Sequence, residues 1–249
     1  MRVAALYDIH GNLPALDAVL RDIRQAEVDL VVVGGDVLPG PMPAETLERL
    51  MNFDSAVRFI RGNGDRVVLA DTAGQDISEV PAPFQETIRW TAQQLRRVHE
   101  QWVALWPTTC HVEIDGLGGV LFCHATPRND TEIFTRLTPE ARLAPVFADV
   151  NVSMVVCGHT HMQFDRTVGG VRVVNAGSVG MPFAAPSGAY WLLLAPEVQL
   201  RCTEYDFAKA AEQIRATSYP QAETLAVRYV LNPPTEAESL QMFAGAELS

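Results

Sequence analysis

The sequence predicts an α/β protein built around a largely parallel β-sheet, and two observations lead to this fold class. In the first half of the chain, short runs of β-branched apolar residues alternate with longer amphipathic stretches, as in repeated strand–helix units. The chain has 249 residues, 48% of them hydrophobic, which is enough for one substantial core but short for two independent domains. We therefore expect one domain over residues 1–218 and a C-terminal helical extension over residues 219–249, packed on the core or on a partner subunit.

The first half of the chain supplies alternating strands and helices. The strands are short apolar runs, expected at Val3–Tyr7, Val28–Val33 and Ala56–Ile60. The helices have apolar residues at helical spacing, expected at Leu13–Ala26, Ala44–Met51 and Phe84–Val98. Asn12 precedes the first helix as its N-cap, and Pro14 lies in its first turn. The Pro- and Gly-rich stretches between these elements are expected to be loops.

The second half becomes richer in strands. They are expected at Cys110–Ile114, Gly119–Cys123, Val152–Cys157, Phe164–Val168, Val171–Val174, Ala189–Ala195 and Val198–Tyr205. Helices are expected at Pro139–Ala148 and Phe207–Thr217. Beyond Tyr219, two short helical patterns flank Asn232-Pro233-Pro234 and form the C-terminal extension.

Charge and hydropathy limit the partners and the compartment. The net charge of −11 disfavours an extended nucleic-acid surface or an anionic membrane, whereas a small phosphorylated substrate fits if cations reverse the local field. No apolar run approaches the roughly 20 residues of a membrane span, and no basic leader precedes the first strand, so we expect a cytoplasmic protein. Whether it forms a homo-oligomer stays open.

Residues of metal-ligand type directly follow several of the expected strands. The groups are Asp8-Ile9-His10-Gly11-Asn12, Gly34-Gly35-Asp36, Gly62-Asn63-Gly64-Asp65, His124 and Gly158-His159-Thr160-His161. Because ligands bind at the carboxyl ends of strands in an open α/β sheet, these loops can converge on one crevice. Taken alone, the Asp-, Asn- and Gly-containing groups can be ordinary turns, and a single His can be structural. The Gly-His-Thr-His group is the most specific, since two imidazoles so close together suit chelation.

Seven of these residues are candidate metal ligands: Asp8, His10, Asp36, Asn63, His124, His159 and His161. Imidazoles mixed with carboxylates and an amide favour a transition metal over Mg²⁺ or Ca²⁺. Seven ligands exceed what one four-coordinate ion needs and suit two ions that share a carboxylate. We therefore expect two divalent ions drawn from Mn, Fe, Zn, Co and Ni, with Mn favoured.

In order and spacing, these motifs resemble the calcineurin-like metallophosphoesterase family, in particular its small bacterial and archaeal phosphodiesterase-like members. The resemblance extends from Met1 to about Gly180 and implies a four-layer αββα sandwich. It implies that one ion is held by Asp8, His10 and His161, the other by Asn63, His124 and His159, and that Asp36 bridges both. The expected reaction is hydrolysis of a phosphodiester or nucleotide-type ester by a hydroxide that bridges the metals, with Asp36, Asn63 and His124 as catalytic residues.

Further positions bear on the substrate. Asn12 and Arg128 lie just beyond ligand positions and are expected substrate contacts, as is Asp130, although Arg128 can equally form a surface ion pair. Gly64 stands where many family members carry a histidine that assists the leaving group, so the proton donor stays open. The stretch Asn175–Gly180 resembles a glycine-rich turn of small family members and is interpreted as a structural turn outside the site.

Two other functions compete with hydrolysis. The first is a catalytically inactive scaffold of the same fold that binds partner proteins, which arises in this family when metal ligands are lost. All seven ligand positions are kept here, which argues against that function. The second is a nucleotide-binding α/β module, but no strand is followed by G-x-G-x-x-G or G-x-x-x-x-G-K-[ST].

Overall fold

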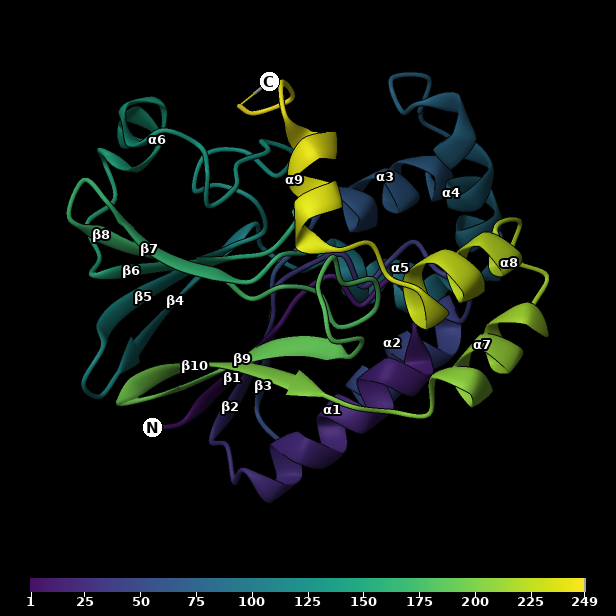
Figure 1. Cartoon of the computed structure of the whole chain (residues 1–249). Helices are drawn as coiled ribbons and strands as arrows, with labels where there is room; N and C mark the ends of the chain where they lie inside the picture. Colours follow the sequence, from purple (N-terminus) through teal and green to yellow (C-terminus); the bar gives the residue numbers. More distant parts are fainter. Residues whose placement is uncertain (249) are drawn as a thin grey trace.

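Two five-stranded β-sheets pack face to face in the computed structural model, which describes residues 1–248 (Figure 1). The first sheet has the order β10-β9-β1-β2-β3, with β1 at Val3–Leu6, β2 at Leu30–Val33, β3 at Val57–Phe59, β9 at Ala189–Ala195 and β10 at Glu197–Thr203. The second has the order β4-β5-β6-β8-β7, with β4 at Thr109–Ile114, β5 at Gly118–Cys123, β6 at Met154–Cys157, β7 at Phe164–Val168 and β8 at Val171–Asn175.

Each sheet is mixed, which corrects the expectation of a largely parallel arrangement. In the first sheet β1, β2 and β3 run parallel, while β9 and β10 pair antiparallel. In the second sheet β5, β6 and β8 run parallel, while β4 and β7 pair antiparallel at the two edges. The strand–helix units supply the parallel strands, because a crossover is needed between them, and the hairpins supply the antiparallel ones.

The side chains of alternating residues in the central strands point into two different hydrophobic layers. Val3 and Ala5 of β1 face the second sheet, where they meet Phe122 of β5 and Val156 of β6. Ala4 and Leu6 of β1 point the other way, into the layer of helices. The helices on that side are α1 (Leu13–Gln25), α2 (Pro43–Met51), α3 (Asn63–Thr72), α4 (Ala82–Gln94) and α5 (Arg97–Ala104).

The outer face of the second sheet is covered by α6 (Glu140–Phe147), whose Leu143 and Phe147 pack on Val155 of β6 and Val173 of β8. The layers therefore run helix, sheet, sheet, helix, which confirms the predicted four-layer αββα sandwich. Among the described residues, no helix is long and apolar enough to cross a membrane.

Two helices differ from the sequence-based expectation. Helix α3 begins at Asn63, in a stretch that was predicted to be a loop, and Gly62 and Asp65 form its N-terminal cap. The single helix predicted at Phe84–Val98 is two helices, because the backbone is extended at Leu95 and Arg96. There the Arg96 N–H donates to Nδ1 of His99, a cap that the usual sequence signatures do not include.

The C-terminal segment, defined here as residues 219–248, follows α7 (Phe207–Arg215) and contains α8 (Ala222–Leu225), a π-helical turn η1 (Ala226–Leu231) and α9 (Glu236–Phe243). Ala211 and Ile214 of α7 pack on Leu225 and Val230 to form a small cluster, against which Met42 and Met181 also pack. Figure 1 shows α9, in yellow, between the loops on the α6 side and helix α3. Ser249, the last residue of the predicted extension, lies outside the described residues.

Candidate metal centre

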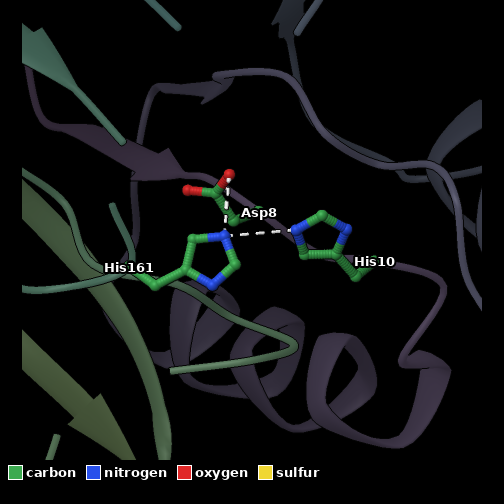
Figure 2. A group of neighbouring side chains, drawn as sticks. All are labelled: Asp8, His10 and His161. Atoms are coloured by element: carbon green, nitrogen blue, oxygen red, sulfur yellow. Dashed lines mark hydrogen bonds and ion pairs between the residues drawn. The ribbon is translucent and has the colours of Figure 1, made fainter. Parts of the chain in front are cut away.

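The predicted ligands converge into two adjacent groups. Asp8, His10 and His161 form the first ligand group, and their ligand atoms all lie within 4.8 Å of one another (Figure 2). Asp36, His124 and His159 form the second ligand group under the same limit. Asn63 adjoins the second group, with its Oδ1 3.0 Å from Nε2 of His124. The structure therefore brings all seven candidate ligands together.

The pairing of the parallel strands explains why distant motifs meet. Leu6 pairs with Val33 at the ends of β1 and β2, so the loops that follow run side by side. The Asp8 N–H donates to the Gly35 carbonyl at 3.1 Å, and the His10 N–H donates to the Asp36 carbonyl at 3.0 Å. Gly35 is required at this crossing, because its φ is +92° and an added Cβ would lie 2.5 Å from the Gly62 nitrogen.

Five of the seven ligand residues adopt a left-handed backbone conformation, with φ of 53° at Asp8, 47° at His10, 50° at Asp36, 65° at His159 and 59° at His161. Non-glycine residues seldom occupy this region, which costs of order 1–3 kcal/mol each where the conformation is strained. Such residues cluster at sites where the surrounding structure holds them for a function. Of the described non-glycine residues, Glu27 and Leu248 also adopt the left-handed conformation, so five of the seven residues with this conformation are candidate ligands.

The side chains of this centre fit a cation. Asp8 Oδ1 is buried and receives no hydrogen bond, and the Asn63 side-chain amide lies 3.0 Å from both Nε2 of His124 and Nδ1 of His159. Nδ1 of His124 lies 3.0 Å from the Gly34 carbonyl, and Nδ1 of His161 lies 2.6 Å from the Met181 carbonyl. Since a carbonyl can only accept, both Nδ1 atoms carry a proton, so Nε2 is the atom that each ring directs at the centre and can offer to a cation.

His159 also directs a ring nitrogen at the centre, but in its ring this atom is Nδ1. Its Nε2 lies 3.2 Å from the Thr131 carbonyl, which leaves Nδ1 free to face Asn63. Carboxylate oxygens, an amide oxygen and unprotonated imidazole nitrogens are the ligands of borderline divalent metals. This donor set suits such ions better than Mg²⁺ or Ca²⁺.

The electrostatics of the centre favour positive charge. Burial lowers the pKa of His124, but the Asp36 and Asp8 carboxylates outweigh it and raise the pKa to about 10. Burial raises the pKa of Asp36, and the neighbouring His124 and His10 bring it below the ordinary aspartate value. Burial, followed by the charge of His124, lowers the pKa of His159 to about 4. The two carboxylates therefore stabilise positive charge between them, which is the charge that a bound cation would supply.

The expected substrate contacts differ in their accessibility. Asn12 is wholly buried, its amide nitrogen donates to the Gly180 carbonyl at 2.9 Å, and its oxygen caps α1 at the Ala15 nitrogen, so we correct its role from substrate contact to helix cap. The Arg128 side chain is 52% exposed and pairs with Glu132 at 2.6 Å. It lines, together with His124, a cavity of ≈ 270 Å³.

Asp130 lines the same cavity and is engaged by Arg66, whose Nε and Nη2 donate to its carboxylate at 2.6 and 2.9 Å. Gly64, at the position of the missing histidine, has no room for a side chain. An added Cβ there would lie 2.4 Å from the Leu38 carbonyl oxygen.

The loop after β8, interpreted from the sequence as a structural turn outside the site, supports two of the candidate ligands directly. Ser178 Oγ donates to the Asp8 carbonyl at 2.7 Å, and the Gly180 N–H donates to the same carbonyl at 3.0 Å. The Met181 carbonyl accepts from His161. The signal available in the sequence was the likeness of this turn to glycine-rich turns of small family members.

Asp65 is a second residue whose role the motif alone did not indicate. It is fully buried and accepts three backbone hydrogen bonds, from Asp36 and Leu38 in one ligand loop and from Gly62 in another. Burial and the Asp36 carboxylate raise the pKa of Asp65 to about 7, while the backbone donors lower it. Asp65 therefore clamps the loop of Asp36 to the loop of Asn63.

The fold and the site together define an α/β sandwich with a metal centre where its parallel strands end. Residues 1–195 match the calcineurin-like phosphoesterase superfamily domain, so the chain belongs to this family. Phosphodiesterase YfcE of Escherichia coli (strain K12) is 26% identical over 202 residues, covering 78% of this chain and 87% of that protein. Uncharacterized protein MJ0912 of Methanocaldococcus jannaschii is 26% identical over 238 residues, covering 88% and 94%.

Solved structures agree with this family. A metallophosphoesterase from Sphaerobacter thermophilus superposes with a TM-score of 0.70 at 26% identity, covering 92% of this chain and 97% of that one. Hypothetical protein PH1004 from Pyrococcus horikoshii OT3 has the same fold, with a TM-score of 0.79, 23% identity, and coverage of 94% and 99%. The chain is a metal-dependent phosphoesterase.

Proposed function

We propose that the chain hydrolyses a phosphodiester or nucleotide-type ester with two divalent transition-metal ions, Mn²⁺ being favoured. The observation that carries this proposal is the position of Asp36. Its Oδ2 lies 3.9 Å from Nε2 of His10 in the first ligand group, and its Oδ1 lies 3.5 Å from Nε2 of His124 in the second. A carboxylate with one oxygen toward each group fits a bridging ligand. When bound, such a pair of ions lowers the pKa of water and neutralises charge on the phosphoryl oxygens.

The chain's own residues hold this arrangement. The Gly64 N–H donates to Asp36 Oδ1 at 2.8 Å, and the His159 N–H donates to Asp8 Oδ2 at 2.9 Å, so backbone donors orient both carboxylates. Asp8 Oδ1 lies 3.5 Å from Nε2 of His161 and 3.9 Å from Nε2 of His124. Preorganised groups of this kind need little rearrangement when charge develops in the transition state.

The cavity beside His124 is the proposed position for part of the substrate. Thr108, Thr109 and Thr126 line it together with Arg128. Arg128 is oriented by Glu132, whose pKa is lowered by this same guanidinium. A guanidinium held at the rim of the second ligand group suits contact with an anionic phosphoryl oxygen.

The test is a hydrolysis screen with Mn²⁺-reconstituted protein over diesters, nucleotide esters, dinucleoside polyphosphates and phosphomonoesters. We expect Mn²⁺-dependent hydrolysis, highest for diesters or nucleotide-type esters. Asp36→Ala should lose more activity than Asp8→Ala, since Asp36 turns a separate oxygen toward each ligand group, whereas Asp8 approaches both groups through the single atom Oδ1. The exposed Asp54→Ala should serve as an unchanged control.

No Mn²⁺-dependent turnover in the wild-type protein would contradict the proposal and favour a scaffold. Near-normal activity and metal content in Asp36→Ala would contradict the bridging role.

A further inference from the structure

Phe183 joins the first ligand group to the rest of the molecule. Its ring lies against the imidazole of His161, with 4.8 Å between ring centroids, and its N–H donates to the His161 carbonyl at 3.1 Å. Two residues earlier in the chain, the Met181 carbonyl accepts from His161 Nδ1 at 2.6 Å. Residues 181–183 thus contact His161 at its ring face, its Nδ1 and its backbone.

The C-terminal segment contacts Phe183 in turn. Tyr229 of η1 and Phe243 of α9 each place a ring centroid 6.1 Å from that of Phe183. All three rings are buried or half-buried, with Phe183 only 7% exposed. Tyr229 lies within the π-helical turn, a rare conformation that often marks functional sites. A continuous row of rings therefore leads from the C-terminal segment to a metal ligand.

The segment is anchored on both sides of this row. At its start, the Tyr219 ring packs on Trp90 of α4 at 5.3 Å between centroids, and Gln221 Nε2 donates to the Pro83 carbonyl at 2.8 Å. At its end, the Leu248 N–H donates to the Ile133 carbonyl at 2.7 Å. These anchors do not involve Phe183, so the segment is attached to the rest of the molecule independently of the row of rings.

We propose that the C-terminal segment is a positioning element of the metal centre, in which Tyr229 and Phe243 hold Phe183 against His161. The hydrogen bond to Met181 fixes one nitrogen of the imidazole, and the packing of Phe183 restricts rotation of the ring about that bond. Nε2 of His161 then stays 3.5 Å from Asp8 Oδ1 and 3.2 Å from Nε2 of His10. The inference rests on the proposed function in one respect, namely that the first ligand group holds an ion.

The test is calorimetric titration of the metal-free full-length protein with Mn²⁺. A His10→Ala variant identifies the binding step that belongs to the first ligand group, since it removes one of its ligands. We expect Tyr229→Ala/Phe243→Ala to weaken that step about 10-fold, the low end of the effect of removing a group that orients a metal ligand. The step of the second ligand group should be unchanged, and Tyr229→Leu/Phe243→Leu, which restores bulk, should recover most of the affinity.

Val230→Ala is the matched control. Val230 neighbours Tyr229 in the chain, is 1% exposed and belongs to the cluster with α7. Tyr229 and Met181 also pack against this cluster, but Val230 contributes no ring to the row that reaches Phe183. It should lower the unfolding temperature without changing the ratio of the two Mn²⁺ affinities, whereas the double alanine variant should change that ratio.

Wild-type affinities at both steps in a folded double variant would overturn the inference. Equal weakening of both steps, matched by Val230→Ala, would also overturn it, because the segment would then act only through general stability. A single ion in the wild-type protein would contradict the two-ion function by itself. Even then, comparison of the double alanine variant with His10→Ala decides the inference. The inference holds if the double variant weakens the Mn²⁺-binding step that His10→Ala removes, and fails if it leaves that step unchanged.

Discussion

Asp65→Asn changes one buried atom and should weaken both the fold and the metal centre. Asp65 Oδ1 accepts from the Leu38 N–H at 2.9 Å, and Oδ2 accepts from the N–H groups of Asp36 at 2.9 Å and Gly62 at 3.0 Å. An asparagine can keep its oxygen at the Oδ2 position, but its NH₂ group then faces the Leu38 N–H. That places one donor against another in a site without exposure to solvent.

The magnitude follows from the unmatched donors. One buried N–H without an acceptor costs about 1–3 kcal/mol, so Asp65→Asn should lower the free energy of unfolding by that amount. Asp65→Ala removes all three acceptor contacts and should cost about 3 kcal/mol or more. Because the clamp positions the loops of Asp36 and Asn63, Mn²⁺ affinity should also fall, by about 10- to 100-fold.

The assay is urea unfolding of metal-free protein at pH 8, where Asp65 with a pKa of about 7 is mostly ionised, followed by Mn²⁺ titration of the folded variants. Asp54→Asn makes the same chemical change at an exposed position and should stay within about 0.5 kcal/mol of the wild type. An Asp65→Asn protein as stable as Asp54→Asn, with unchanged Mn²⁺ affinity, would refute the clamp.

Three further predictions concern the centre itself. General acid catalysis typically increases the rate of a reaction about 10²–10⁴-fold. Because Gly64 supplies no proton donor, aryl and nucleotide-type esters, whose leaving groups need no proton, should be cleaved much faster than alkyl esters. A shallow dependence on leaving-group acidity, with chemistry shown to limit the rate, would show that another group donates the proton. His159→Gly should be more stable than His159→Ala in metal-free urea unfolding, by about 1 kcal/mol, because φ is 65° at this position. At His111, an exposed position in β4, the alanine variant should instead be more stable than the glycine variant. If glycine were the more stable substitution at both positions, or alanine at both, the positive φ of His159 would not explain the difference. Arg128→Ala should raise KM more than it lowers kcat in steady-state assays if the guanidinium binds substrate, and an unchanged KM would leave Arg128 as a surface ion pair.

The sequence was informative where residue type and strand position coincide. Asp8, Asp36 and His124 follow short apolar strands that are easy to detect, so their convergence could be predicted from the geometry of an α/β sheet. Helix α3 was missed because its first turn consists of Asn63, Gly64 and Asp65, which are residues typical of turns.

Other features left no such signal. The support of His161 by the Met181 carbonyl uses a group that every residue carries, so residue type could not reveal it. The contacts of Phe183 with Tyr229 and Phe243 join three separate parts of the chain, and isolated aromatic residues in a sequence indicate burial rather than a partner. Such contacts become visible only when tertiary packing is known.

Anomalous diffraction from crystals equilibrated with Mn²⁺ tests whether the centre holds two ions that share Asp36. We expect two Mn²⁺ peaks about 3.5–4 Å apart. One should lie among Asp8, His10 and His161, the other among Asn63, His124 and His159, with the Asp36 carboxylate between them. A single peak under metal-replete conditions, with His124 and His159 turned away from it, would contradict the two-ion centre.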